Sequence, residues 1–240
     1  MIERPLGRRK PTNWVHTARY PLTAATVPTT PVPVVLGALW YSNFDRPTVG
    51  SDGRWWIGRG DLGHIRGGHA VCLKPQSLRD SVAWWQWFNQ GQEGACVGFA
   101  ASRAMTLLNR KRYDARWLYR EAQRVDEWPG EDYSGTSVRA AMDVLRRVGH
   151  APTYRGVTRP VDAAEGITEN RWATSVDEVL TCLQSPAYAT IGAVPVLNSW
   201  GTSFPHIVWL PLETLDRLLR EDGEATIFTD RPNVKEKHHG

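Results

Sequence analysis

The chain has 240 residues, of which 41% are hydrophobic, 22% charged and 10% aromatic, and its formal net charge is +4. This is the composition of an ordinary globular protein, and it excludes disordered, collagen-like and low-complexity chains. No apolar run approaches the ~18 residues of a membrane span, and no apolar segment follows the charged N-terminal residues. We therefore expect neither an integral membrane protein nor a secretory signal. No stretch interleaves basic residues with stacking aromatics, so nucleic-acid binding is not expected.

The N-terminal part of the chain is predicted to be an arm followed by two strands. Residues 1–31 are basic and then rich in threonine and proline, which predicts an extended arm. Residues 32–41 form an apolar run with the length of a buried strand. Residues 43–63 are rich in turn residues and predict a loop with one short hairpin. Residues 69–75 predict a second strand, because apolar residues alternate and a proline ends the run.

The middle of the chain is predicted to be helical. Asp114 and either Thr174 or Ser175 stand where their side chains would cap helix N-termini, and Gly149 stands where a glycine commonly ends a helix. The predicted helices are residues 95–112, 114–125, 137–149, 174–184 and 212–223. The predicted C-terminal strands are residues 195–200, 206–211 and 225–230, before a polar tail of residues 231–240.

Helices in the middle and strands at both ends predict an α+β fold in which the N-terminal strands pair with the C-terminal ones. We expect a single domain over residues 32–230. The three cysteines are too few for a disulfide scaffold and odd in number, so a reducing compartment is expected. Cys72 and Cys182 are expected to pack inside their strand and helix.

The third cysteine lies in the sharpest local signal of the sequence, the segment NQGQEGACVGFA at residues 89–100. A glycine-rich turn places Cys96 in the first turn of a predicted helix. The positive end of the helix dipole there lowers the pKa of a thiol and favours the nucleophilic thiolate. For a lone cysteine at this position, a small buried residue that begins a core helix is the more common interpretation.

Two further segments favour the nucleophile. His69 begins a predicted strand in the segment GGHAV, residues 67–71, and Asn198 begins the segment NSWG, residues 198–201, at the end of another. Together with QGQEGAC, residues 90–96, these segments resemble the motifs of the papain-like cysteine peptidases. That family carries its nucleophile in a Gln-Gly-x-x-Gly-x-Cys segment, its base in a Gly-His-Ala-Val-like strand and an orienting amide in Asn-Ser-Trp-Gly. The run VPVVLGALWYSNF also resembles the strand and loop that precede the family's histidine.

The resemblance implies a role for each matching residue. Cys96 would be the nucleophile, His69 the general base and Asn198 the residue that orients the His69 ring. The thiol and the imidazole would rest as a thiolate–imidazolium pair. The Gln90 side chain and the backbone N–H of Cys96 would donate to the oxyanion, and Trp200 would shield the histidine–asparagine pair.

The chain departs from the family in the order of these residues. Family members carry cysteine, histidine and asparagine in that order, whereas this chain has His69, Cys96 and Asn198. Strand pairing depends on neighbours in the sheet and not on chain order. We therefore interpret the difference as a relocated histidine strand that lies antiparallel beside the strand before Asn198. Glu93 replaces a cysteine that often forms a disulfide in the family, and Val97 replaces a frequent tryptophan, which puts the leaving-group side of the cleft in doubt.

The resemblance also implies a two-lobed fold with a rearranged strand order and with the active site in the cleft. The helical lobe would comprise residues 84–150, and the β-rich lobe residues 32–75 and 151–230. Gly135 has two possible interpretations. Family members pair their backbone with the substrate in this region, but a turn before a helix would explain the glycine equally well.

The other histidines have their own readings. His206 begins a strand after the NSWG segment and is the alternative base; otherwise it is a structural residue. His64 and His69 are close enough in sequence to suggest a metal pair, but no carboxylate cluster at ligand spacing accompanies them. Neither a metal nor a cofactor is therefore expected. His150 follows a helix-ending glycine and is expected to cap that helix.

These observations predict a thiol hydrolase, a papain-like protease that cleaves peptide or related amide bonds in a peptide or protein substrate. We expect it in the cytoplasm or in association with a virion, in a bacterium or a phage. Two alternatives stay open. One is a catalytically silent papain-like protein with a structural or binding role, for instance in a viral particle. The other is a cell-wall amidase or transamidase, because all these enzymes share the acyl-transfer machinery.

Overall fold

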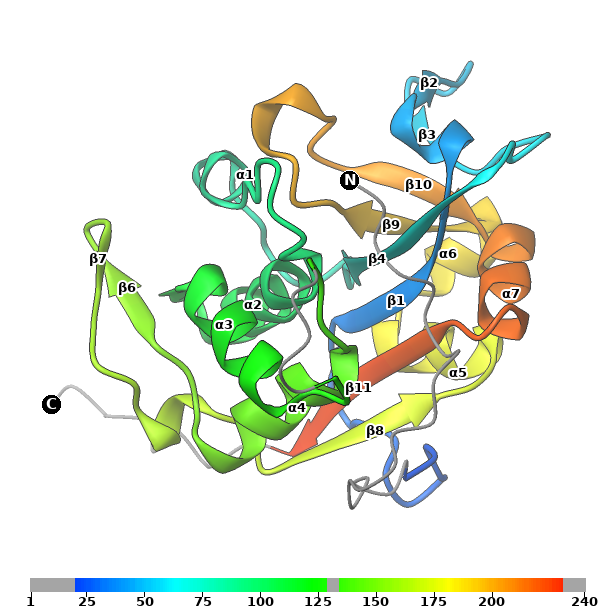
Figure 1. Cartoon of the computed structure of the whole chain (residues 1–240). Helices are drawn as coiled ribbons and strands as arrows, with labels where there is room; N and C mark the ends of the chain where they lie inside the picture. Colours follow the sequence, from blue (N-terminus) through cyan, green and yellow to red (C-terminus); the bar gives the residue numbers. More distant parts are fainter. Residues whose placement is uncertain (1–19, 129–133, 231–240) are drawn as a thin grey trace, which may run out of the picture.

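The computed structural model describes residues 20–128 and 134–230. Its largest element is an eight-stranded mixed sheet with the strand order β2-β3-β10-β9-β4-β1-β11-β8 (Figure 1). Neighbouring strands run antiparallel, except that β3 and β10 are parallel. The strands of this sheet are β1 (Val34–Tyr41), β2 (Thr48–Val49), β3 (Trp55–Trp56), β4 (Ile65–Leu73), β8 (Glu169–Ala173), β9 (Ala193–Leu197), β10 (Val208–Pro211) and β11 (Glu224–Asp230).

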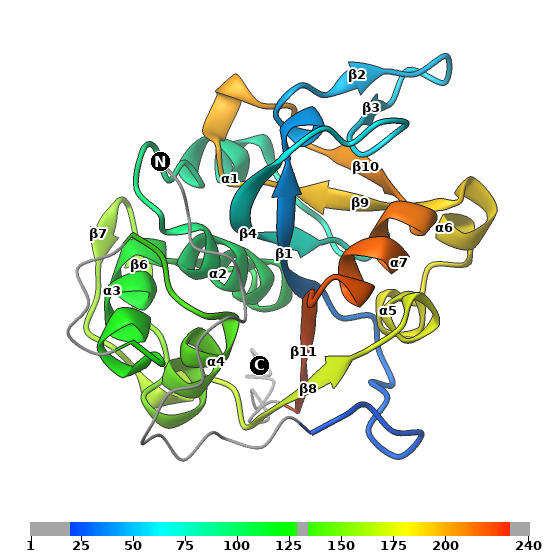
Figure 2. The same cartoon turned by 45° about the vertical axis from the view of Figure 1, so that its right-hand side comes forward.

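Helices pack against the sheet in two groups (Figures 1 and 2). The helices α2, α3 and α4 share one buried cluster with the sheet, and α5 and α7 share another. None of the helices in the described part of the chain is long and apolar enough to cross a membrane. The helices are α1 (Val82–Trp87), α2 (Cys96–Asn109), α3 (Ala115–Val125), α4 (Val138–Arg147), α5 (Val176–Leu183), α6 (Pro186–Ile191) and α7 (Leu212–Arg220).

Strand β1 lies inside this arrangement, and its sequence shows why. Successive side chains of a strand point to opposite faces of the sheet. Val34 and Leu36 belong to the cluster that contains α5 and α7, whereas Val35 belongs to the cluster that contains α2, α3 and α4. Because both faces are buried, the strand is a continuous apolar run instead of an alternating one.

The expected α+β fold is confirmed. The N-terminal strand β1 pairs with the C-terminal strand β11, with Val35 opposite Thr226, as the sequence predicts. Residues 20–22 of the predicted arm lie alongside β8. The backbone N–H of Trp172 donates to the Tyr20 carbonyl, and the Trp172 carbonyl accepts from the Leu22 N–H. Residues 1–19 of the arm and the tail of residues 231–240 lie outside the described residues.

The structure corrects one boundary of the predicted lobes. Residues 152–158 were assigned to the β-rich lobe, but they form β6 (Pro152–Tyr154) and β7 (Val157–Thr158), which extend a three-stranded sheet from β5 (Arg112–Tyr113). This small sheet belongs with the helical part of the chain, because β5 directly follows α2. The predicted helix of residues 95–112 ends at Asn109, since Arg110 adopts a left-handed backbone conformation (φ 57°).

Candidate active site

His69 and Asn198 come from neighbouring strands. Strand β4, which carries His69, pairs antiparallel with β9, with Cys72 opposite Leu197, and Asn198 directly follows β9. This confirms the predicted pairing of the two strands. The His69 ring nitrogen Nε2 lies 2.8 Å from the Asn198 side-chain oxygen Oδ1, and both side chains are buried.

The hydrogen bonds around Asn198 determine the tautomer of His69. The Asn198 oxygen Oδ1 also accepts the backbone N–H of Ser199 at 2.7 Å, which fixes the orientation of the amide. Because Oδ1 can only accept, the proton between it and His69 must reside on Nε2. The His69 nitrogen Nδ1 then carries the lone pair, as a general base requires. The amide nitrogen of Asn198 is buried and has no hydrogen-bond partner in the described part of the chain.

The charge of His69 differs from the expectation. Burial lowers the pKa of His69 from 6.5 to about 4, although the hydrogen bond to Asn198 and the charge of Asp45 act in the opposite direction. The ring is therefore neutral at pH 7. The resemblance implies a resting imidazolium beside a thiolate, whereas this lowered pKa, to which no thiolate charge contributes, favours a neutral imidazole that is able to take a proton.

Cys96 is the first residue of α2, as predicted. The preceding residue, Ala95, provides no side-chain cap, so the N-terminal end of this 14-residue helix keeps its positive potential at the cysteine. Helix α2 packs against β4 and β1. Cys96 is buried in the same cluster as Ala70, the neighbour of His69, and Leu197, the neighbour of Asn198.

Gln90 is tied to the segment after β9. Its backbone N–H donates to the Ser199 carbonyl at 2.8 Å, and the Ser199 hydroxyl donates to the Gln90 side-chain oxygen. The Gln90 side-chain nitrogen donates one N–H to the Glu93 carbonyl at 2.8 Å. An amide nitrogen has a second N–H, and the Gln90 side chain lines the cavity beside His69, where this donor could meet an oxyanion.

Two tryptophans flank the His69 ring. The ring centroid of Trp200 lies 5.3 Å from that of His69, in the position where the resemblance expects a shielding indole. Trp40, on β1, lies closer, at 4.5 Å, and meets the imidazole edge-on. Trp40 was not predicted as a site residue. It reaches the ring because β1 and β4 are paired with Ala38 opposite His69, which also places Trp40 opposite Gly67.

A cavity of about 210 Å³ opens beside these rings. Asp45 and Arg66 contribute the charged side chains of its lining, and neither was predicted from the sequence. No motif marks these two residues. Arg66 lies on β4, the strand that carries His69, and Asp45 ends the short 3₁₀ helix Ser42–Asp45 that follows β1. The lining residues are Trp40, Asp45, Arg66, Gly67, Gly68, His69, Gln90 and Trp200.

The loop that carries Gln90 is held by an arginine of α3. Arg116 Nε donates to Glu93 Oε2 at 2.9 Å, and Arg116 Nη2 donates to the carbonyls of Asn89 and Gln90 at 3.2 and 3.3 Å. Glu93 occupies the position where papain-like peptidases often have a disulfide-forming cysteine. An ion pair and two backbone contacts thus restrain this loop without a covalent bond.

Gly135 lies close to this loop but faces α3. Its backbone N–H donates to the Tyr119 hydroxyl at 3.2 Å, and its carbonyl accepts from the Gln123 side chain at 3.3 Å. Its φ of 130° is a conformation that favours glycine. Since the N–H and the carbonyl are both engaged, the structure supports the turn before α4 over backbone pairing with a substrate.

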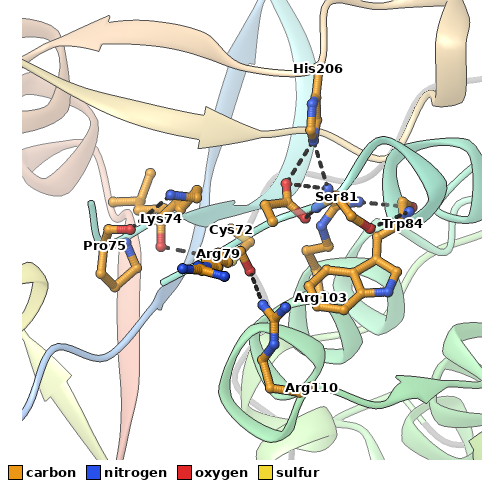
Figure 3. Close-up of polar contacts among 11 residues, drawn as sticks. Cys72, Lys74, Pro75, Arg79, Ser81, Trp84, Arg103, Arg110 and His206 are labelled. Carbon is orange, nitrogen blue, oxygen red and sulfur yellow. Dashed lines mark hydrogen bonds and ion pairs between the residues drawn. The ribbon is translucent and has the colours of Figure 1, made fainter. Parts of the chain in front are cut away.

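His206, the alternative base, belongs to a different cluster (Figure 3). Its Nε2 lies 2.7 Å from Asp80 Oδ2, and the same oxygen receives Arg103 Nη2 at 2.6 Å. The His206 ring stacks on Trp85 with the two planes 10° apart. His206 does not line the cavity beside His69, and His69 is the histidine that bonds Asn198.

The remaining predicted residues are structural. His150 is fully buried and does not cap a helix as expected: its Nδ1 accepts the backbone N–H of Ala151 and its Nε2 bonds the Ser102 hydroxyl. Burial raises the pKa of the Cys72 and Cys182 thiols to about 12, so both are inert. Within residues 20–128 and 134–230, no three histidine, cysteine or carboxylate side chains are grouped as metal ligands.

Comparisons of the chain with protein-family models, with curated proteins and with solved structures found no match.

Proposed function

We propose that the chain is a papain-like thiol hydrolase that cleaves peptide or related amide bonds. The observation that carries the proposal is the 2.8 Å contact between His69 and Asn198, which are 129 positions apart in the sequence. The N-terminal end of α2, with Cys96, packs in the same buried cluster as the neighbours of both residues. In this proposal the helical part of the chain and the large sheet form the two lobes of the cleft.

The neutral His69 determines how the reaction would begin. Nδ1 of His69 takes the proton of the Cys96 thiol as the sulfur bonds to the substrate carbonyl carbon. The carbon–nitrogen bond then breaks, and the imidazolium gives the proton to the leaving amine. Water attacks the resulting thioester with His69 again as the base. The products are a carboxylic acid and the restored thiol, so no oxidant or further reactant is needed.

Two donors would stabilise the oxyanion that forms during each attack. One is the backbone N–H of Cys96, at an uncapped helix N-terminus. The other is the second N–H of the Gln90 side-chain amide, which the Ser199 hydroxyl orients through the amide oxygen. Each such donor contributes roughly 3 kcal/mol to the stabilisation of a transition state of this kind.

A catalytically silent papain-like protein is the second candidate. The observation in its favour is the burial of Cys96, whose exposed fraction is only 4%. The sulfur must be accessible to attack a substrate carbonyl. If the Cys96 thiol stays buried, the protein would have only a binding or structural role.

Thiol reactivity distinguishes the two candidates. The protein is treated with limiting iodoacetamide at pH 7 and the modified peptides are identified by mass spectrometry. The hydrolase predicts that Cys96 reacts well before Cys72 and Cys182, which serve as internal controls because burial raises the pKa of both thiols to about 12. It also predicts hydrolysis of N-benzyloxycarbonyl-glycine p-nitrophenyl ester that Cys96→Ser abolishes. Modification of all three thiols only after denaturation, with no ester hydrolysis, would establish the silent protein.

A further inference from the structure

An ion pair in the wall of the cavity has no part in the proposed chemistry. Arg66 Nη1 lies 3.1 Å from Asp45 Oδ2, and both side chains line the cavity together with His69. The two residues between Arg66 and His69 are glycines, so no intervening side chain of this strand screens the guanidinium from the imidazole.

Asp45 and Arg66 differ in how many hydrogen-bonding groups each still has for a ligand. Asp45 Oδ1 accepts the indole N–H of Trp40 at 2.9 Å, and its other oxygen faces Arg66. Arg66 is 53% exposed and, among the described residues, forms its ion pair through one terminal nitrogen. A guanidinium has five N–H donors in a planar fork. The group that this wall can still offer to a ligand is therefore the positively charged guanidinium of Arg66, as a hydrogen-bond donor.

The position of this donor follows from the reaction. His69 delivers a proton to the leaving amine, so the residue that bears this amine must lie against the His69 ring. The cavity beside that ring holds about 210 Å³, less than the roughly 300 Å³ of the smallest drug-binding pockets. A cavity of this volume fits a single amino-acid residue beside the indoles of Trp40 and Trp200, whose ring centroids lie 5.5 Å apart.

We infer that Arg66 selects a carboxylate on the leaving-group residue of the substrate, an inference that rests on the proposed thiol hydrolysis. The carboxylate is either an acidic side chain or the free carboxylate of a chain end, and the guanidinium recognises both by the same bidentate chemistry. A cationic leaving group would be repelled by Arg66. It could not reach Asp45 as easily, because Asp45 is the more buried and the more fully bonded partner.

Acyl transfer tests this inference on the whole protein. An amine that intercepts the acyl-enzyme occupies the leaving-group position, so amines added to the p-nitrophenyl ester assay report on the cavity. Glutamic acid α-amide carries only a side-chain carboxylate and glutamine only an α-carboxylate. Glutamine amide carries neither, and lysine amide carries a cation. Yields of the four acyl-transfer products are measured for the wild type, Arg66→Gln and Arg220→Gln. Arg220 pairs with Asp216 on α7, so its variant loses the same charge outside the cavity.

The wild type and Arg220→Gln should favour a carboxylate-bearing amine over glutamine amide by about fivefold, the upper range for a solvent-exposed ion pair. Arg66→Gln should remove this preference, and added salt should weaken it. Comparing each amine between proteins cancels differences in the basicity of the amines. The preferred amine tells whether the carboxylate is a side chain or a chain end. Equal yields in the wild type, or a preference that survives Arg66→Gln, would overturn the inference alone. Absence of Cys96-dependent ester hydrolysis would overturn the proposed function, and this inference with it.

Discussion

The two ring nitrogens of His69 have different hydrogen-bonding roles. Nε2 donates to Asn198, and Nδ1 is left with the lone pair. We expect His69→Ala to slow Cys96-dependent ester hydrolysis by roughly 10²- to 10⁴-fold, the usual contribution of a positioned general base. His206→Gln is the control, because His206 bonds Asp80 in a separate cluster and Gln can still donate to that carboxylate. Equal losses in the two variants, measured at pH 7, would show that His69 is not the base.

Asn198 controls the charge that His69 can carry. Its oxygen accepts from His69 and from the Ser199 backbone, while its buried nitrogen has no described partner. Asn198→Asp replaces the neutral acceptor by a carboxylate, which favours the imidazolium and raises the pKa of His69. The acidic limb of the kcat/KM profile should therefore move to higher pH by about one unit or more. An unchanged profile in an active variant would contradict the placement of Asn198 beside the base.

At the scale of the elements, the loop of residues 89–94 depends on α3. Arg116 contacts Glu93 and the carbonyls of Asn89 and Gln90, so Arg116→Ala should loosen the Gln90 donor. In the proposed mechanism that donor acts only on the oxyanion, so kcat should fall about tenfold while KM changes little. Iodoacetamide labelling of Cys96 should persist.

The control for this prediction is Arg120→Ala, an exposed arginine of the same helix. Glu93→Gln should cost less than Arg116→Ala, because Arg116 still reaches both carbonyls without the carboxylate. A parallel loss of kcat and of Cys96 labelling in Arg116→Ala would instead mean that Arg116 supports the whole site and not the oxyanion donor.

The sequence predicted those elements that carry their own physical signature. The run of residues 32–41 is apolar throughout because β1 is buried on both faces, and Asp114 and Ser175 do cap α3 and α5. Helix α1 was missed because its VAWWQW segment has six residues and no amphipathic period. Strand β8 was missed because its ENRWA segment is short and polar at its start.

The residues of the candidate site also fall into those that the sequence could predict and those that it could not. His69, Cys96 and Asn198 stand in local motifs, and a resemblance in sequence alone could suggest that they meet. Asp45 and Arg66 belong to no motif. Arg66 lies on β4 where a bulge between Trp40 and Tyr41 shifts the pairing with β1, and Asp45 lies in the short helix that follows β1. Register is decided by packing across the whole sheet, which a local pattern cannot specify.

At the scale of the whole molecule, two buried histidines link stability to pH. Burial lowers the pKa of His69 to about 4 and that of His150 to about 3, from 6.5 for each. The backbone N–H of Ala151 already occupies the lone pair of His150 Nδ1, which a second proton would displace. Both residues are thus neutral in the folded protein at pH 5, whereas both are protonated in the unfolded chain.

The unfolded state therefore binds more protons below pH 6.5, and the free energy of unfolding falls as the pH drops from 6.5 toward 4. A separation of 1.5 pH units between 6.5 and 5 amounts to about 2 kcal/mol for each histidine. Urea denaturation at pH 8 and pH 5 should show this loss, and His150→Gln should remove roughly half of it. Gln is the suitable replacement because its amide can accept from Ala151 and donate to Ser102, the two partners of His150. Equal stability at the two pH values in the wild type would mean that burial does not lower the pKa of these two histidines, and the neutral His69 of the proposed mechanism would lose its support.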